Sequence, residues 1–360
     1  MRSVLAAVAL FITVLCASYG AVAQQLVDLY KVNTLVASQQ AKERNEAASQ
    51  ALAQLLVRVT GDTQIGESAE LAGYLKQAQN YVLQFGYNRS TQTLVQDDGR
   101  EVDAFELVFT FSEVAVEKLL RKLQLPIWPS NRPSVLVWLV EDQWPDGRAV
   151  VTKAEVHGQL RAEALRRGLP LAFPLWDLED QMAISTEQLW QFSPETLKTA
   201  SFRYQPNVIV VGRYSRTSSG ELRGVWQWLD GENSELLDSR GDNEAMLAAP
   251  MIDEIANKLA ARYAIVPGRE ANTLLMAHIS DINSFDQYRE ILTYLENHEA
   301  LRSTQLVKAE GESLWIALYP ESDLSHLQRA FELDKKLVPM QTLIAPDGSE
   351  TNPLIYRWHR

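Results

Sequence analysis

Residues 135–140 read VLVWLV, and residues 208–211 read VIVV. In both stretches the apolar run is continuous rather than alternating, which is typical of strands covered on both faces. Between them lie a helical stretch that ends near Gly168 and a short apolar strand at 169–173. This alternation of strands and helices predicts a layered α/β domain built around a mixed, largely covered sheet.

Two stretches that contain proline, and so are typical of domain boundaries, flank this central domain. The first, 126–133, reads PIWPSNRP, and its prolines fix the backbone and suit a rigid join. The second is the VPGR sequence at 266–269. We therefore expect a signal peptide and three domains, with these bounds: a signal at 1–23, an N-terminal α+β domain at 24–128, a central α/β domain at 129–267, and a C-terminal domain and tail at 268–360.

The outer domains are predicted from periodicity. Apolar residues recur at helical spacing over 47–60 and again over 71–82, and two strands meet across the turn signal Asp98-Gly99. After residue 268 the order is strand, helix, strand, strand, helix, with a last strand expected near Leu343. That order predicts a ferredoxin-like α+β domain.

Helix starts are marked by side chains that can bind free backbone N–H groups. Thr152 with Glu155, and Ser284 with Gln287, have the spacing of capping boxes. Both pairs are expected to begin a helix.

Residues 1–23 have the pattern of a cleavable secretory signal: Arg2, an apolar run from Val4 to Leu15, and the small-residue ending Ala21-Val22-Ala23. The run is too short to span a bilayer, and no later stretch is long enough. Leu15 before Cys16 speaks against lipidation, because a small residue is expected there. We expect a soluble periplasmic protein of a Gram-negative-type cell, with no transmembrane segment after signal cleavage.

Cleavage would remove Cys16, the only cysteine, and with it disulfides, thiolate metal sites and cysteine nucleophiles. Without Arg2, 33 of the 34 basic residues remain against 46 acidic ones, so the formal net charge is −13. Because this acidity would repel phosphates, we expect no nucleic acid partner.

Catalytic and cofactor motifs are missing from the sequence. The five histidines fall on separate expected elements without metal-ligand spacing. There is no phosphate-binding loop, dinucleotide fingerprint or nucleophile elbow. We expect no metal, no cofactor and no enzymatic activity, with a hydrolase triad assembled from distant residues kept as an alternative.

One acidic loop is a candidate binding site. Asp177, Glu179 and Asp180 follow a predicted sheet strand, where open α/β sheets place ligand sites. The carboxylates could bind a hard cation or a partner's basic groups. They could equally cap the following helix while Trp176 packs on the core, and this structural interpretation is favoured.

The join supplies a second candidate, formed by Trp128, Asn131 and Arg132. An aromatic ring beside a guanidinium could face a glycan or a protein partner. The alternative, which is favoured, is a stiff interdomain hinge stapled by Trp128.

Several stretches together resemble a family of Gram-negative envelope proteins known as domain of unknown function 2066. They are the helix at 47–60 with Gly61, the join at 125–133, the strand at 135–140, the loop at 167–180, and residues 208–213. The resemblance implies a periplasmic location and no established activity, so it lends no catalytic residues. More weakly, the central segment is similar to the α/β domains of outer-membrane activators of peptidoglycan synthases and of the curli secretion component.

Three functions follow as hypotheses. The first is a non-enzymatic interaction or accessory protein in cell-envelope assembly, with an envelope protein as partner. The second is a periplasmic protein that binds a glycan or another small ligand, and the third is an unrecognised hydrolase. An exposed apolar patch would favour the first, a deep pocket lined by Trp and carboxylates the second, and a polar nucleophile beside a base the third.

Overall fold

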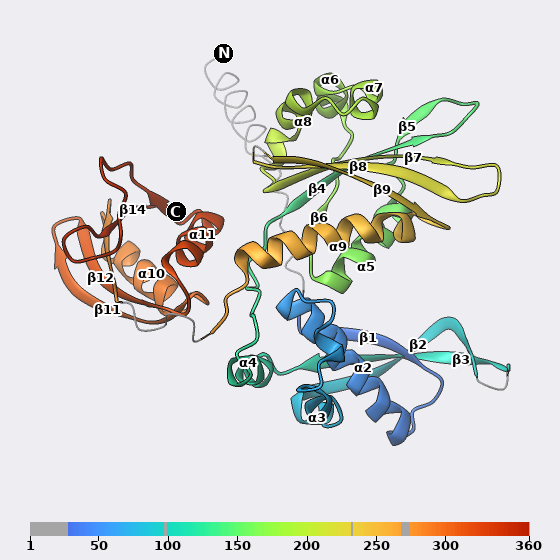
Figure 1. Ribbon diagram of the computed structural model, residues 1–360, viewed down its shortest axis with the longest axis horizontal. Coiled ribbons are helices and arrows are strands. Elements are labelled where there is room, and N and C mark those ends of the chain that lie inside the picture. The colour runs from blue at the N-terminus through green and yellow to red at the C-terminus, as the bar shows by residue number, and fades with distance from the viewer. Residues whose placement is uncertain (1–27, 97–98, 232, 268–273, 360) are drawn as a thin grey trace, which may run out of the picture.

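A computed structural model describes residues 28–96, 99–231, 233–267 and 274–359. Within these residues the strands form three sheets, and Figure 1 shows each sheet in a lobe of its own. Each sheet takes its strands from a single one of the three segments expected as domains. The signal sequence at 1–23 lies outside the described residues.

The N-terminal lobe packs helices on a small antiparallel sheet with the strand order β1-β3-β2. Leu52, Leu55 and Leu56 of the long helix are fully buried, and their cluster includes Phe109 of the sheet. The elements are β1 (Lys31–Val36), α2 (Ala41–Thr60), the 3-10 turn η1 (Ile65–Glu67), α3 (Ala72–Leu75), the 3-10 turn η2 (Ala78–Tyr81), β2 (Val82–Val95), β3 (Glu101–Phe111) and α4 (Glu113–Lys122).

The prediction of one helix over 71–82 is wrong in the length of the helix. The structure has only the short α3 and the turn η2 there, and Val82 already begins a strand. The predicted hairpin is present as β2 and β3, although Asp98 of its turn lies outside the described residues.

The central lobe is a layered α/β domain around a mixed sheet with the order β5-β4-β7-β8-β9, in which β6 pairs with β4. Strand β4 is parallel to β6 and β7 and antiparallel to β5. The elements are β4 (Val135–Asp142), β5 (Arg148–Val150), α5 (Ala154–Arg167), β6 (Leu171–Ala172), α6 (Leu178–Ala183), α7 (Thr186–Trp190), α8 (Pro194–Ser201), the 3-10 turn η3 (Phe202–Tyr204), β7 (Val208–Arg216), β8 (Leu222–Asp230), β9 (Asn233–Gly241) and α9 (Glu244–Tyr263).

Both faces of this sheet are covered, as the apolar runs predict. Val135, Val137 and Leu139 of β4 pack in a cluster with residues of α5 and α9, whereas Trp138 and Val140 pack with residues of α7 and α8. Figure 1 shows α5 and α9 below the sheet and α6 to α8 above it.

The C-terminal lobe has the predicted strand, helix, strand, strand, helix order, followed by two more strands. The sheet order is β11-β12-β10-β14-β13. The elements are β10 (Leu275–Ser280), α10 (Phe285–Glu296), β11 (Leu301–Glu310), β12 (Ser313–Pro320), α11 (Leu324–Asp334), β13 (Leu337–Pro339) and β14 (Leu354–Trp358).

This lobe departs from a regular ferredoxin-like sheet at its last strand. Strand β12 is antiparallel to β10, so a strand entering beside β10 directly from α11 would also be antiparallel to it. Here the chain first runs through β13 and turns back, and β14 therefore lies parallel to β10. The last strand expected near Leu343 is wrong, because that residue lies between β13 and β14.

The chain is thus a multidomain protein that combines α/β and α+β lobes. No helix in the described parts has both the length and the apolar character that a bilayer span needs.

Candidate functional site

The join between the first two lobes is organised by Arg132. Its guanidinium donates to the backbone carbonyl oxygens of Pro129, Trp128, Arg58, Arg167 and Gly168 over 2.8 to 3.3 Å. It also lies 4.0 Å from the centre of the Trp128 ring. Arg132 is 2% exposed and Trp128 1% exposed, so neither group presents a surface to a glycan or a protein partner.

Two further buried arginines complete the join. Arg58 donates to the carbonyl oxygens of Leu29 and Lys31, and Arg167 donates to the carbonyl of Gly61 and to the side chains of Asp253 and Asn257. Burial, followed by the nearby charge of Arg58, lowers the pKa of Arg132 to about 9. Arg132 therefore stays charged at neutral pH, with carbonyl dipoles as its main partners.

The acidic loop is held by interactions within the central lobe. Asp177 caps α6 by accepting from the backbone N–H of Asp180, and Arg203 donates to both of its carboxylate oxygens over 2.7 and 3.0 Å. These hydrogen bonds, the one from Arg203 first, lower the pKa of Asp177 to about 2. Asp177 is thus tied to its own fold.

Asp180 is fully buried and accepts hydrogen bonds from the Tyr204 hydroxyl over 2.6 Å and the Trp176 backbone N–H over 2.8 Å. Glu179 is the most exposed of the three acids, with 69% of its side chain accessible against 41% for Asp177, and it lies 3.4 Å from Arg203. Among the described residues no group of three His, Cys, Asp or Glu side chains is placed to hold a metal ion. These contacts agree with a capping role for the loop.

The third candidate residue of the join leads to a different site. Asn131 is exposed and donates to Asp334 of the C-terminal lobe. It lines a cavity of about 780 Å³ where the join, the end of α9 and the C-terminal lobe meet. We call this the α10 cavity, and its wall includes Asn131, Tyr263, Arg289, Glu290, Thr293, Tyr294, His298, Asp334 and Trp358.

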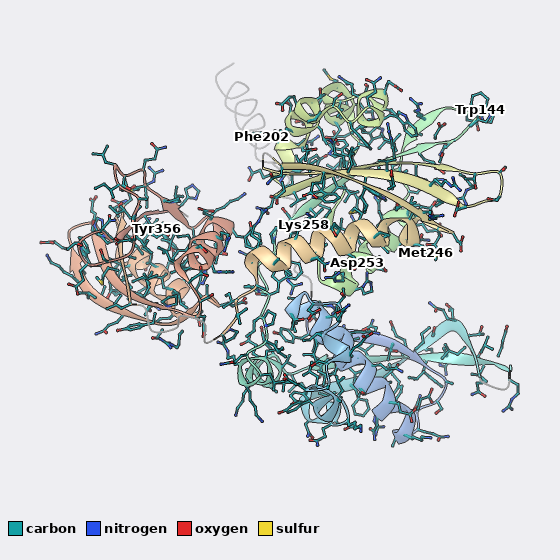
Figure 2. The ribbon with its side chains drawn as sticks, in the orientation of Figure 1. Trp144, Phe202, Met246, Asp253, Lys258 and Tyr356 are labelled. Atoms are coloured by element: carbon teal, nitrogen blue, oxygen red, sulfur yellow. The ribbon has the colours of Figure 1, made fainter. Side chains whose placement is uncertain are left out.

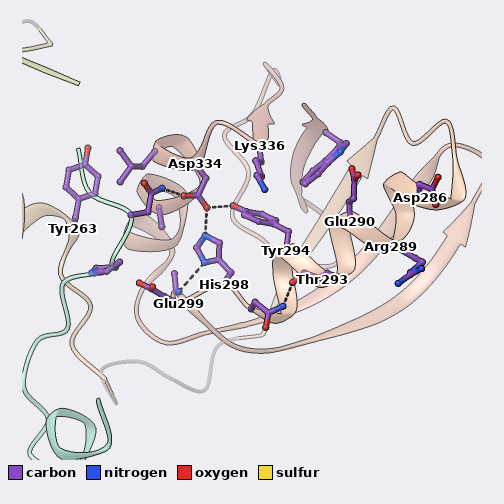
Figure 3. Close-up of a pocket in the computed structure, with 17 residues that line it drawn as sticks. Tyr263, Asp286, Arg289, Glu290, Thr293, Tyr294, His298, Glu299, Asp334 and Lys336 are labelled. Atoms are coloured by element: carbon purple, nitrogen blue, oxygen red, sulfur yellow. Dashed lines mark hydrogen bonds and ion pairs between the residues drawn. The ribbon is translucent and has the colours of Figure 1, made fainter. Parts of the chain in front are cut away.

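A hydrogen-bonded cluster forms the floor of the α10 cavity (Figure 3). Asp334 accepts from the Tyr294 hydroxyl over 2.6 Å and lies 3.0 Å from Nε2 of His298. Burial alone would raise the pKa of Asp334, but the hydrogen bonds from His298 and Tyr294 outweigh it and lower the pKa. Burial and the Asp334 charge raise the pKa of Tyr294, which keeps its phenol protonated.

Both ring nitrogens of His298 are engaged. Nδ1 accepts from the backbone N–H of Ala300 over 3.1 Å, so the ring proton belongs on Nε2, where it points to Asp334. Neither nitrogen offers a free lone pair to a substrate in this arrangement, which suits a structural role better than that of a general base.

A second cavity of about 1110 Å³ adjoins the first, with Asn131, Tyr294, Leu333, Asp334 and Lys336 in the walls of both. It also reaches Leu136 and Asn207, near the amino ends of β4 and β7, and Phe173 and Leu175 just after β6, but not the acidic loop at 177–180 where a ligand was expected. We call it the basic cavity, and its wall includes Arg161, Leu165, Leu171, Phe173, Leu175, Lys335 and Lys336.

Neither cavity has a local signal in the sequence, because the walls come from distant segments. Asp334 and His298 are far apart in the chain and meet only through the packing of α10 beside α11. The proline-rich join was the one usable pointer, since ligand sites favour domain boundaries.

Comparison with known proteins adds little to this geometry. A family model described as domain of unknown function (DUF8605) matches residues 23–129. The resemblance to domain of unknown function 2066 is therefore wrong. Its motifs are an amphipathic helix, a proline-rich join and buried strands, which packing demands alone can produce.

No curated protein matches the chain. Among solved structures, the crystal structure of a competence-damaged protein (CinA) superfamily protein from Enterobacter cloacae is matched at 13% identity, over 41% of this chain and 87% of that one. The TM-score of 0.19 is too low to support a comparison of folds. The N-terminal lobe is thus the part of the chain that is similar to a family, and that family has no assigned function.

Proposed function

We propose that this chain is a non-enzymatic ligand-binding protein of the periplasm, with its site where the join meets the C-terminal lobe. The observation that carries the proposal is the α10 cavity of about 780 Å³, to which three separated segments contribute aromatic, amide and charged side chains. A volume in this range is typical of small-molecule sites, which also favour domain boundaries.

One wall of this cavity has an unused donor. Trp358 is 7% exposed, and its buried indole Nε1 has no hydrogen-bond partner among the described residues. Buried donors are ordinarily paired, so an unpaired one beside a cavity is consistent with a partner supplied by a bound molecule. The engaged nitrogens of His298 favour binding over hydrolysis.

Native mass spectrometry of the protein purified from its own periplasm tests this proposal. We expect a released small molecule with the wild type, and a mature chain that starts at Gln24. Thr293→Trp, on the exposed face of α10, should fill the cavity and remove that molecule. Glu332→Trp, an exposed helix position outside both cavity walls, should leave it bound. An empty wild-type protein, or equal occupancy in the two variants, would contradict the proposal.

A second candidate is the interaction protein of envelope assembly. Leu178 and Met182, one helical turn apart on α6, are 72% and 80% exposed. Phe202, the first residue of η3 directly after α8, is 78% exposed (Figure 2). Arg203 ties these two segments together through Asp177. Exposed apolar side chains gathered in this way favour a protein partner.

Crosslinking in intact cells tests the second candidate. The pair Leu178→Asp and Met182→Asp should abolish a specific crosslink, whereas Leu83→Asp, an equally exposed apolar position on β2, should preserve it. A crosslinked species unchanged by the α6 pair would exclude this surface.

A further inference from the structure

The basic cavity gathers positive charge, although the chain as a whole is acidic. The protein has a formal net charge of −12, yet Arg161, Lys335 and Lys336 gather around this one cavity. Within the described residues none of the three has a carboxylate partner. Arg161 lies over the Phe173 ring at 4.9 Å and Lys336 over the Tyr294 ring at 5.3 Å.

The acids nearby do not neutralise these cations. Two carboxylates, Asp28 and Asp334, also line the cavity, and within the described residues neither forms an ion pair with Arg161, Lys335 or Lys336. Asp334 is occupied by Asn131, Tyr294 and His298. Arg132, the fourth cation of the wall, is buried and directed at backbone carbonyls. With four cations against two carboxylates, the wall of the basic cavity carries a net positive charge.

Between the cations the wall is apolar. Leu171 and Phe173 are largely buried, whereas Leu165 and Leu175 are 38% and 66% exposed and line the same cavity. Leucine side chains left this accessible inside a hollow lose the stabilisation that burial would give them. A ligand with an apolar portion would supply that burial.

We propose that the basic cavity binds an amphipathic organic anion, whose alkyl or aromatic portion lies on Leu165, Leu171 and Leu175 and whose carboxylate or phosphate meets Arg161 and Lys336. The anionic group gains charge-assisted hydrogen bonds, and the apolar portion covers the leucines. This inference rests on the proposed ligand-binding function and names the ligand class for the larger of the two adjoining cavities.

Isothermal titration calorimetry with single-chain probes tests the ligand class. We expect saturable binding of decanoate, at least about tenfold weaker binding of decyltrimethylammonium, and affinity that falls by up to about fourfold for each methylene removed on going to hexanoate. The affinity for decyl phosphate is compared with that for decanoate, and the probe that binds more tightly identifies the anionic headgroup.

Matched variants locate the site. Arg161→Gln with Lys336→Gln should weaken decanoate binding about tenfold. Lys76→Gln with Arg89→Gln, which removes the same charge from exposed positions of the N-terminal lobe, should change it less than twofold. Circular dichroism and an unchanged unfolding midpoint establish that both double variants fold.

Two results would overturn the inference: equal affinity for the anionic and cationic chains, or decanoate binding that is insensitive to Arg161 and Lys336. If decanoate fails to bind while the purified protein still carries a molecule that Thr293→Trp displaces, the ligand class is wrong and the binding function stands. If the purified protein is also empty, both proposals fail.

Discussion

The guanidinium of Arg132 stacks 4.0 Å from the centre of the Trp128 ring and donates to the carbonyl oxygens of Arg58 and Gly168. One side chain thereby bonds to the last turn of α2 in the N-terminal lobe and to the residue that ends α5 in the central lobe. Figure 1 shows these two lobes meeting beside α5.

Replacing Arg132 with Met should destabilise the protein strongly. The change leaves buried carbonyl oxygens without donors and should lower the free energy of unfolding by about 3 to 5 kcal/mol. Urea unfolding followed by circular dichroism measures it. Arg89→Gln on the exposed face of β2 serves as the control and should stay within about 0.5 kcal/mol of the wild type.

Gly168→Ala should disturb the same join. The residue has φ +68, and a Cβ atom there would lie 2.1 Å from Nη1 of Arg132 and 2.7 Å from Cγ of Arg58. Gly231 has a similar φ of +61 with open space around it, so Gly231→Ala isolates the backbone strain, about 1 kcal/mol. We expect Gly168→Ala to lose at least about 2 kcal/mol more. Equal losses in the two variants would show that the lobes can separate at little cost.

Asp180 and Glu179 of the acidic loop should differ sharply in their contributions to stability. Asp180→Ala leaves the donors of Trp176, Tyr204 and Arg203 without a buried acceptor, and should cost about 2 to 4 kcal/mol. Glu179→Ala should cost no more than about 0.5 kcal/mol, because its side chain is 69% exposed. Thermal unfolding of both variants decides whether this loop is structural, and a stable Asp180→Ala protein would count against a structural role of Asp180.

The contacts of Asp334 with His298, Tyr294 and Asn131 should weaken in acid. The pKa of Asp334 is lower in the folded protein than in the unfolded chain, so its stabilisation is complete above the unfolded value and is lost as the pH falls through the folded value. Asp334→Asn should therefore be less stable than the wild type at pH 7, and the difference should shrink below about pH 4. Unfolding free energies measured from pH 7 to pH 3 test this, and a constant difference would show that Asp334 does not titrate with folding.

The sequence predicted the elements whose signals are local. Ser284 accepts from the backbone N–H of Gln287 over 3.2 Å, as its spacing indicates. The pair Thr152 and Glu155 has the same spacing, but α5 begins at Ala154 and its N-cap, Lys153, makes no side-chain cap bond. The observed N-cap can thus lie one position away from the one that the sequence indicates, when the packing of the helix on its sheet sets where the helix begins.

The two cavities could not be predicted from neighbouring residues in the sequence, for a related reason. Asp177 to Asp180 stood out because charges close together in sequence are easy to see, yet Arg203 and Tyr204 neutralise and cover them. The cations of the basic cavity come from the join, from α5 and from the residues after α11, and no spacing rule connects those segments. Only the fold brings them together.

The proline-rich join ought to resist proteases, unlike most segments that connect lobes. The backbone N–H groups of Ile127, Trp128 and Ser130 are all hydrogen-bonded, to Ile265, Val59 and Glu299, so no extended stretch is free to enter a protease cleft. Limited digestion should first cut the exposed loop around Leu343 and Ile344, and leave a large core fragment in which the first two lobes are still joined.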